Sequence, residues 1–160
     1  MSLIRNAFFG FILLAAGWGS PLMALEAGDF PYPGFRVIDT AHGFGELVKR
    51  LNGAIAANGM AAVTRASATK GAASLGVTIP GNMVIGVYHP KFAVRMLEAS
   101  IPAGIEAPLI FYVTENADGT ASLSYRAPSA VFGPYGSAAL DRMAAELDTI
   151  FAAIADGATK

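Results

Sequence analysis

Cysteine is absent from all 160 residues of the chain. This absence excludes disulfides, thiol catalysis, zinc–thiolate sites, iron–sulfur clusters and haem attached through thioether bonds. Histidine is nearly absent too, because only His42 and His89 occur. Any site that depends on an imidazole is therefore restricted to one of these two positions.

Charge is also scarce. Charged residues make up 14% of the chain, with 11 Lys+Arg against 12 Asp+Glu and a formal net charge of −1, whereas soluble domains average about 25%. Without a basic excess to neutralise phosphates, we expect no nucleic-acid partner. The hydrophobic fraction of 54% excludes a disordered polyelectrolyte, and the length predicts a single domain.

Residues 1–24 have the pattern of a secretory signal peptide. Arg5 precedes an apolar run over residues 7–16, a glycine- and proline-containing break follows, and small residues stand at Ala24 and Ala27. That order is typical of a cleaved signal. We expect cleavage after Ala24 or Ala27 and a periplasmic or secreted location.

The alternative for this segment is an uncleaved anchor in the inner membrane. Residues 6–25 carry no charge, a stretch of the length that crosses a bilayer, ~20 residues. Glycine and proline within this stretch disfavour a continuous helix. Contact with a membrane is expected only if residues 1–24 are retained.

Apolar periodicity over residues 30–157 predicts one domain of alternating strands and helices. Strand patterns cover 35–40, 60–65, 82–88, 109–115 and 120–126; helix patterns cover 44–55, 67–75, 91–99 and 140–154. Asp118-Gly119 between the last two strands is a hairpin signal, and Gly157 is placed after the end of the last helix. The order β-α-β-α-β-α-β-β-α predicts an α/β (α+β) sandwich, a mixed β-sheet with helices packed against it.

His89 is the residue that most suggests chemistry. It follows the apolar strand 82–88, predicted to be central, and precedes Pro90, which suits the first residue of a helix. Ligands of open α/β sheets bind outside the carboxyl ends of strands, and imidazole there can bind haem iron, copper or zinc. Met96 is a second candidate metal ligand, provided that the corner between strand and helix folds back, and Tyr88 and Arg95 complete a candidate cofactor site.

A second interpretation of the same residues is purely structural. In that interpretation His89 caps a turn, while Met83 and Met96 fill gaps in the core, as methionine commonly does. The aromatic residues are open to the same two interpretations, a pocket for a small apolar ligand or a core and subunit interface. They are Tyr88, Phe92, Phe111, Tyr112, Tyr125, Phe132 and Tyr135.

Signals for enzymatic chemistry are weak. The Gly71–Gly76 spacing lacks the Lys-Ser/Thr pair that a phosphate loop requires, and no G-x-S-x-G elbow is present. Glu106 or Glu115 acting as a base is the remaining enzymatic hypothesis. We therefore favour a protein that is not an enzyme.

The chain resembles the DUF302 family over about residues 35–155. The segments that carry the resemblance are 35–40, 47–59, 94–99 (VRMLEA), 103–109 (AGIEAPL), 112–120 (YVTENADGT) and 123–129 (LSYRAPS). The resemblance implies a compact α/β sandwich, often dimeric, but no catalytic residue, because the family name records an unknown function. Many members have Gly-Asn-Pro where this chain has Tyr88-His89-Pro90, so His89 is a candidate specialisation.

These observations lead to two hypotheses from different classes. The first is an exported, non-enzymatic DUF302 domain that binds a small apolar or haem-like ligand, or a metal such as copper, through His89. The second is a structural module that forms a homodimer or docks on a membrane-associated complex. A cavity beside His89 favours the first, and a contiguous exposed apolar patch favours the second.

Overall fold

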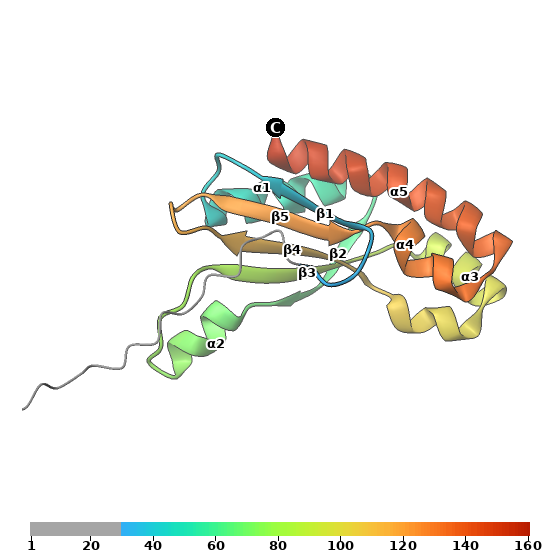
Figure 1. The fold of residues 1–160 in the computed structure, drawn as a ribbon, viewed down its shortest axis with the longest axis horizontal. Coiled ribbons are helices and arrows are strands. Elements are labelled where there is room, and N and C mark those ends of the chain that lie inside the picture. The colour runs from blue at the N-terminus through green and yellow to red at the C-terminus, as the bar shows by residue number, and fades with distance from the viewer. Residues whose placement is uncertain (1–29) are drawn as a thin grey trace, which may run out of the picture.

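The computed structural model describes residues 30–160. They form a five-stranded sheet with helices packed against it (Figure 1). The elements in chain order are β1 (Phe35–Asp39), α1 (Phe44–Ala57), β2 (Ala61–Ala66), α2 (Ala68–Ser74), β3 (Asn82–Tyr88), α3 (Pro90–Ala99), the 3₁₀ helix η1 (Ile101–Glu106), β4 (Leu109–Glu115), β5 (Ala121–Arg126), α4 (Pro128–Phe132), the 3₁₀ helix η2 (Gly133–Tyr135) and α5 (Ala138–Thr159).

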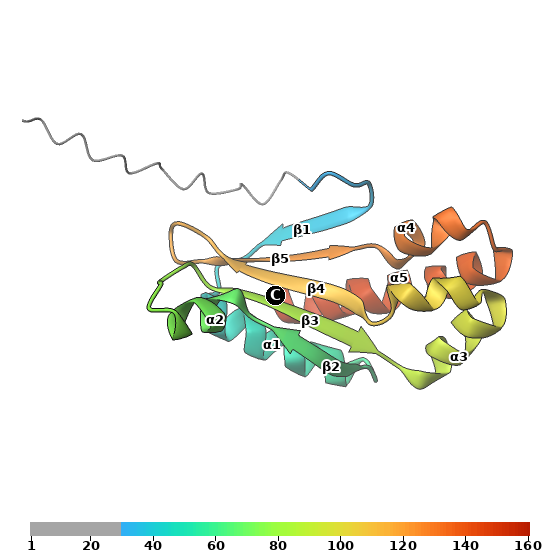
Figure 2. The same ribbon diagram turned by 90° about the horizontal axis from the view of Figure 1, so that it is seen from below.

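The α+β class is confirmed, but the sheet differs from the mixed sheet that was expected. Its strand order is β1-β5-β4-β3-β2, and all four pairings are antiparallel. A helix between two strands commonly signals a parallel crossover. Here α2 and α3 lie at the ends of the sheet, so the chain returns antiparallel beside the strand it left (Figure 2). The central strand is β4, and β3 lies between β4 and β2.

Helices α1 and α5 cover one face of the sheet, and the core lies between these two layers (Figure 2). On α1 the residues facing the core are Leu47, Leu51, Ala54 and Ile55, the spacing of a single helical stripe. Phe111 of β4 stacks on Phe151 of α5, with ring centroids 4.8 Å apart. Aromatic burial therefore joins the central strand to the longest helix.

The prediction that Gly157 follows the end of the last helix is wrong. Helix α5 continues through Gly157 to Thr159. A Cβ on Gly157 would lie 3.3 Å from Cβ of Ala54 on α1, so glycine here permits the close crossing of the two helices rather than stopping one. The Arg50 Nε donates to the carbonyl of Ala158 at 2.8 Å, which satisfies a helix-end acceptor.

Three short helices were not predicted from the sequence: η1, α4 and η2. Pro128 is the first residue of α4, a position that tolerates proline because its N–H would be unpaired. These segments are too short to show apolar periodicity. They lie beside one end of the sheet (Figure 1).

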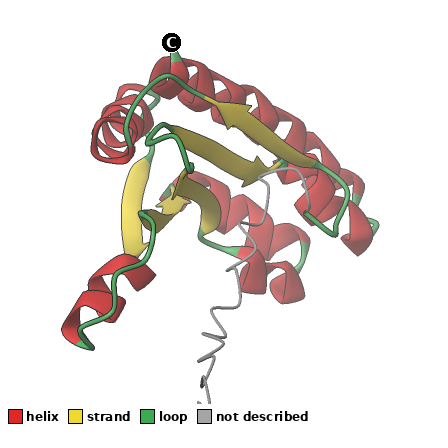
Figure 3. Cartoon of the chain, turned by 60° about the vertical axis from the view of Figure 1, so that its left-hand side comes forward, coloured by secondary structure: helices red, strands yellow, loops and turns green. Residues whose placement is uncertain are grey.

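Within residues 30–160, no helix has the length and apolar character needed to cross a bilayer. The predicted signal peptide or anchor, residues 1–24, lies outside the described residues. Figure 3 shows the sheet with most helices on one side, while α2 stands apart from them.

Across the face of the sheet that α1 and α5 do not cover, referred to below as the open face, strand register aligns side chains in rows. One such row crosses all five strands and consists of Phe35, Arg126, Ile110, Gly86 and Thr64. The next row is Val37, Ser124, Tyr112, Val84 and Ala66, and the third is Asp39, Ser122, Thr114 and Asn82. The open face thus changes from apolar and basic at one end to uniformly polar at the other.

Candidate functional site

His89 connects β3 to α3 and is the N-cap of that helix. Its backbone is extended, with φ −148° and ψ 128°, and Pro90 follows as the first helical residue. The His89 Nδ1 accepts the backbone N–H of Lys91 at 3.1 Å. The imidazole therefore satisfies one of the four N–H groups that a helix start leaves unpaired, which is the structural role considered for it above.

The same imidazole borders a small cavity of about 30 Å³, referred to below as the methionine cavity. Three of the predicted site residues line it: Tyr88, His89 and Met96. His89 and Met96, the two candidate metal ligands, thus border the same cavity. Met60, just before β2, and Met143 of α5 line it as well, and neither was predicted as a site residue.

Hydrophobic side chains make up the rest of the cavity wall: Val87, Phe92, Ala93, Ala107, Leu109, Phe132, Leu147 and Phe151. Pockets for small molecules have volumes of roughly 300–1,000 Å³, about ten times larger than this cavity. The methionine cavity has room for a single ion, whereas a porphyrin needs far more space. Of the two cofactors expected, haem and copper, its size suits copper.

Arg95, predicted as a cofactor-binding residue, does not line the methionine cavity. Both of its terminal nitrogens donate to the Glu146 carboxylate at 2.7 Å, and its guanidinium lies 5.5 Å from the Phe92 ring centroid. The Glu146 carboxylate raises the pKa of Arg95 through this bidentate bond, and Arg95 in turn lowers the pKa of Glu146. Arg95 therefore links α3 to α5, and its guanidinium is already paired with a carboxylate.

Met60 and Met143 were missed because nothing local marks them. Met60 follows the turn at Asn58-Gly59, and Met143 belongs to the apolar stripe of α5, where a core role is the ordinary explanation. The three methionines come from distant parts of the chain. Only the packing of α3 and α5 against the end of the sheet brings them to one cavity.

A second and larger hollow lies on the open face of the sheet and is referred to below as the groove. Its volume is about 600 Å³, within the range of small-molecule sites. Its hydrophobic lining comes from Phe30, Phe35, Ala66, Ala68, Val84, Leu109, Ile110, Tyr125 and Val131. Its polar lining comes from Asn82, Glu106, Tyr112, Ser124 and Arg126. Sequence reasoning did not predict this site.

Arg126 is the cation of the groove. Cross-strand register places it between Phe35 and Ile110, and its Nη2 donates to the Ala130 carbonyl at 2.8 Å. Its Nε is buried and has no hydrogen-bond partner among residues 30–160. A buried donor without a partner carries a free-energy cost, so Arg126 retains the capacity to bind an acceptor.

The two glutamates considered as bases both have structural partners. The Glu106 carboxylate accepts from the Tyr135 hydroxyl at 2.8 Å, and this bond raises the pKa of Tyr135. The Glu115 carboxylate accepts the Gly81 backbone N–H at 2.6 Å, next to the start of β3. In residues 30–160, no three His, Asp or Glu side chains gather as a metal cluster.

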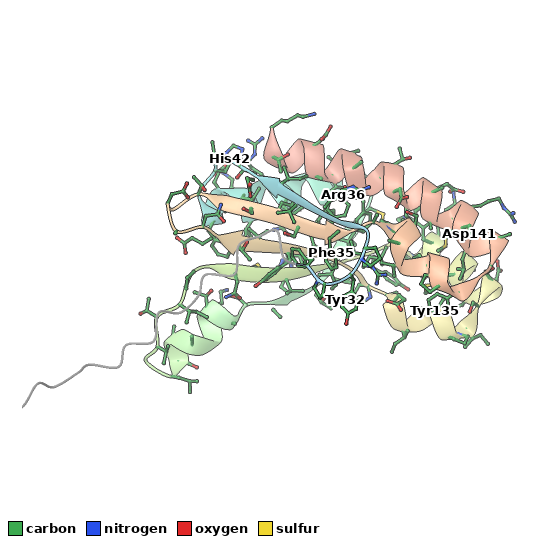
Figure 4. The ribbon with its side chains drawn as sticks, in the orientation of Figure 1. Tyr32, Phe35, Arg36, His42, Tyr135 and Asp141 are labelled. Carbon is green, nitrogen blue, oxygen red and sulfur yellow. The ribbon has the colours of Figure 1, made fainter. Side chains whose placement is uncertain are left out.

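The second histidine, His42, lies away from Glu106. It follows β1 at the end of the molecule opposite Tyr135 and therefore opposite Glu106 (Figure 4). The described residues thus bring together methionines around one imidazole and apolar side chains around one guanidinium.

These features define an α+β domain with one helical layer and a groove on the opposite face of its sheet. The model of the domain of unknown function DUF302 matches residues 37–156. The chain therefore belongs to the DUF302 family, as its resemblance suggested.

A solved structure shares this fold. It is the crystal structure of an uncharacterized conserved DUF302 protein from Bacillus stearothermophilus, with 22% sequence identity and a TM-score of 0.71. The match covers 79% of this chain and 98% of the other. No curated protein matches the chain.

Proposed function

We propose that this DUF302 domain is an exported, non-enzymatic binding protein whose small ligand occupies the groove on the open face of the sheet. The observation that carries the proposal is the buried Nε of Arg126, which has no hydrogen-bond partner within residues 30–160, in a groove of about 600 Å³. A hollow of that size, mostly apolar with a few polar groups, is the usual form of a small-molecule site.

The lining indicates the chemistry of the ligand. Phe35 and Ile110 flank Arg126 and offer apolar surface to a hydrophobic body. Arg126 forms no ion pair within the described chain, so an anionic head group would gain a charge-assisted hydrogen bond. The Glu106 carboxylate also lines the groove, but it accepts from Tyr135. An amphiphile with one carboxylate or sulfonate fits this arrangement.

Anilinonaphthalene sulfonate is a suitable probe, since it combines an aromatic body with a sulfonate and becomes fluorescent in apolar sites. We expect saturable binding to the folded protein. Arg126→Gln should weaken binding by about tenfold, the equivalent of one charge-assisted hydrogen bond. Ala66→Trp, which fills the groove, should abolish it.

Arg36→Gln is the matched control. Arg36 lies on β1 beside Tyr125, on the face opposite Arg126, and within residues 30–160 its Nη1 donates only to the Phe35 carbonyl. It should bind the probe like the unchanged protein. Equal affinity in Arg126→Gln, Ala66→Trp and Arg36→Gln would reject the groove as the binding site, and thermal midpoints would establish that each variant is folded.

A second candidate function is self-association, and it rests on a different surface. Four exposed apolar side chains lie on two adjoining elements, Val94 and Leu97 of α3 and Ile101 and Ile105 of η1. We refer to them as the α3–η1 patch. Ile101 and Ile105 are 78% and 82% exposed. Exposed apolar side chains on adjoining elements are typical of an interaction surface, and we propose a homodimer formed through the α3–η1 patch.

A further inference from the structure

The methionine cavity joins three thioethers and one imidazole from four separate parts of the fold. Four methionines, Met60, Met83, Met96 and Met143, fall within residues 30–160. All but Met83 line this one cavity, together with His89. Met60, Met96 and Met143 are buried, so their sulfurs are removed from water.

The chemistry of this wall is selective. His89 is the only residue with a nitrogen in its side chain among those lining the cavity, and the lining contains no carboxylate. Thioethers are soft ligands suited to Cu⁺, and imidazole also binds copper, whereas Mg²⁺ and Ca²⁺ require oxygen. The cost of burying an ion rises with its charge, so a neutral, apolar cavity also favours a monovalent ion over a divalent one.

We propose that the methionine cavity is a Cu⁺ site whose ligands are the sulfurs of Met60, Met96 and Met143 and the imidazole of His89. A volume of about 30 Å³ accommodates one ion. The ion binds as Cu⁺, and no electron is transferred. This site is separate from the groove, so the Cu⁺ proposal goes beyond the binding function proposed above. Each of the two proposals can be rejected without affecting the other.

Binding of Cu⁺ changes the role of His89. Its Nδ1 accepts the Lys91 N–H, so the neutral ring carries its proton on Nε2, and Nε2 is the nitrogen left for a metal. Ligation through Nε2 requires the proton to move to Nδ1, which ends the bond from Lys91. Binding of the ion thus breaks the N-cap hydrogen bond of α3 with no net release of protons.

The competing explanation is that the methionines only fill the core. Methionine-to-leucine substitutions separate the two cases, because leucine preserves volume and apolar character but lacks sulfur. His89→Asn does the same for the imidazole, because asparagine is among the best N-cap residues. These variants should fold, and near-ultraviolet circular dichroism would verify this.

The test is an anaerobic competition for Cu⁺ against bicinchoninate with the full chain as purified. The unchanged protein should remove one Cu⁺ per chain from the chelator. Met60→Leu, Met96→Leu, Met143→Leu and His89→Asn should each weaken binding by about tenfold or more, by comparison with losses typical of metal-site mutants. Met83→Leu and His42→Asn are the matched controls and should bind like the unchanged protein.

Two results would overturn the proposal. The first is failure of the unchanged protein to compete for Cu⁺, and the second is a control variant that loses as much affinity as the four site variants. Hydrogen exchange gives an independent readout, because the Lys91 amide should exchange faster once Cu⁺ is bound. Unchanged protection of Lys91 in the copper-bound protein would contradict the proposed ligand set.

Discussion

At the scale of single residues, Gly86 shows how closely packed the open face is. It lies on β3 between Thr64 and Ile110 of the neighbouring strands. A Cβ on Gly86 would lie 2.2 Å from Thr64 Oγ1 and 2.7 Å from Pro108 Cγ. The absence of a side chain is therefore what lets β2 and the start of β4 approach β3 at this point.

Gly86→Ala should destabilise the protein by about 1–3 kcal/mol, the usual cost of overpacking. Gly53→Ala is the control, because Gly53 lies inside α1 and its added Cβ would contact nothing within 4 Å. That variant should be more stable by roughly 0.5–1 kcal/mol, because glycine is entropically costly in a helix. Urea unfolding measures the free energy of unfolding of both variants. If Gly86→Ala leaves that free energy unchanged, the strands can move apart at little energetic cost.

At the scale of elements, the Arg95–Glu146 pair holds α3 against α5. Helix α3 carries Met96, helix α5 carries Met143, and both side chains line the methionine cavity. The bidentate geometry, with two donor–acceptor distances of 2.7 Å, gives this exposed pair more directionality than a single contact. Arg95 thereby positions the wall of the site without belonging to it.

This pair predicts a specific dependence on pH. Arg95 lowers the pKa of Glu146 below its ordinary 4.5, so the folded state favours the ionised carboxylate. The stability that the pair contributes is present above pH 4.5 and is lost as the pH falls through the lowered pKa. Glu146→Gln should therefore be less stable than the unchanged protein at neutral pH, with the difference disappearing in acid.

Unfolding by urea at a series of pH values from neutral to acid would measure this difference. Glu98→Gln is the control, because Glu98 also lies near Arg95 on α3 but forms no ion pair among residues 30–160. It should show no such pH-dependent difference. A gap between Glu146→Gln and the unchanged protein that persists in acid would mean that the Arg95 bond is not its origin.

At the scale of the whole molecule, the helices cover one face of the sheet and leave the open face with its groove. The two candidate functions use different parts of this architecture. The groove lies on strands β1 to β5, and the α3–η1 patch lies at one end of the sheet. Ligand binding and self-association are therefore separable by mutation.

Light scattering should report a dimer for the purified protein. Leu97→Glu together with Ile101→Glu should give a monomer, because charges within the α3–η1 patch oppose its burial. Leu75→Glu, directly after α2 at an 80% exposed position, should leave the dimer intact. A monomeric unchanged protein would reject the dimer, and the intact mass of the same sample would test removal of residues 1–24.

Local patterns in the sequence were sufficient to locate most elements. The apolar run 82–88 and the Pro90 start of the next helix predicted β3 and α3 at the bounds observed or within one residue of them. The resemblance to DUF302 was also sufficient to identify the family. Such predictions succeed because side-chain periodicity and capping depend on neighbours within a turn or two of the chain.

Only the tertiary structure decided which residues meet. It made the sheet antiparallel, carried α5 past Gly157, bonded Arg95 to Glu146, and brought Met60 and Met143 to the cavity that His89 and Met96 line. It also placed Arg126 in a groove that no motif marks, where its Nε has no partner among the described residues. The physical reason is that these contacts join distant segments, and their geometry depends on how whole elements pack rather than on local spacing.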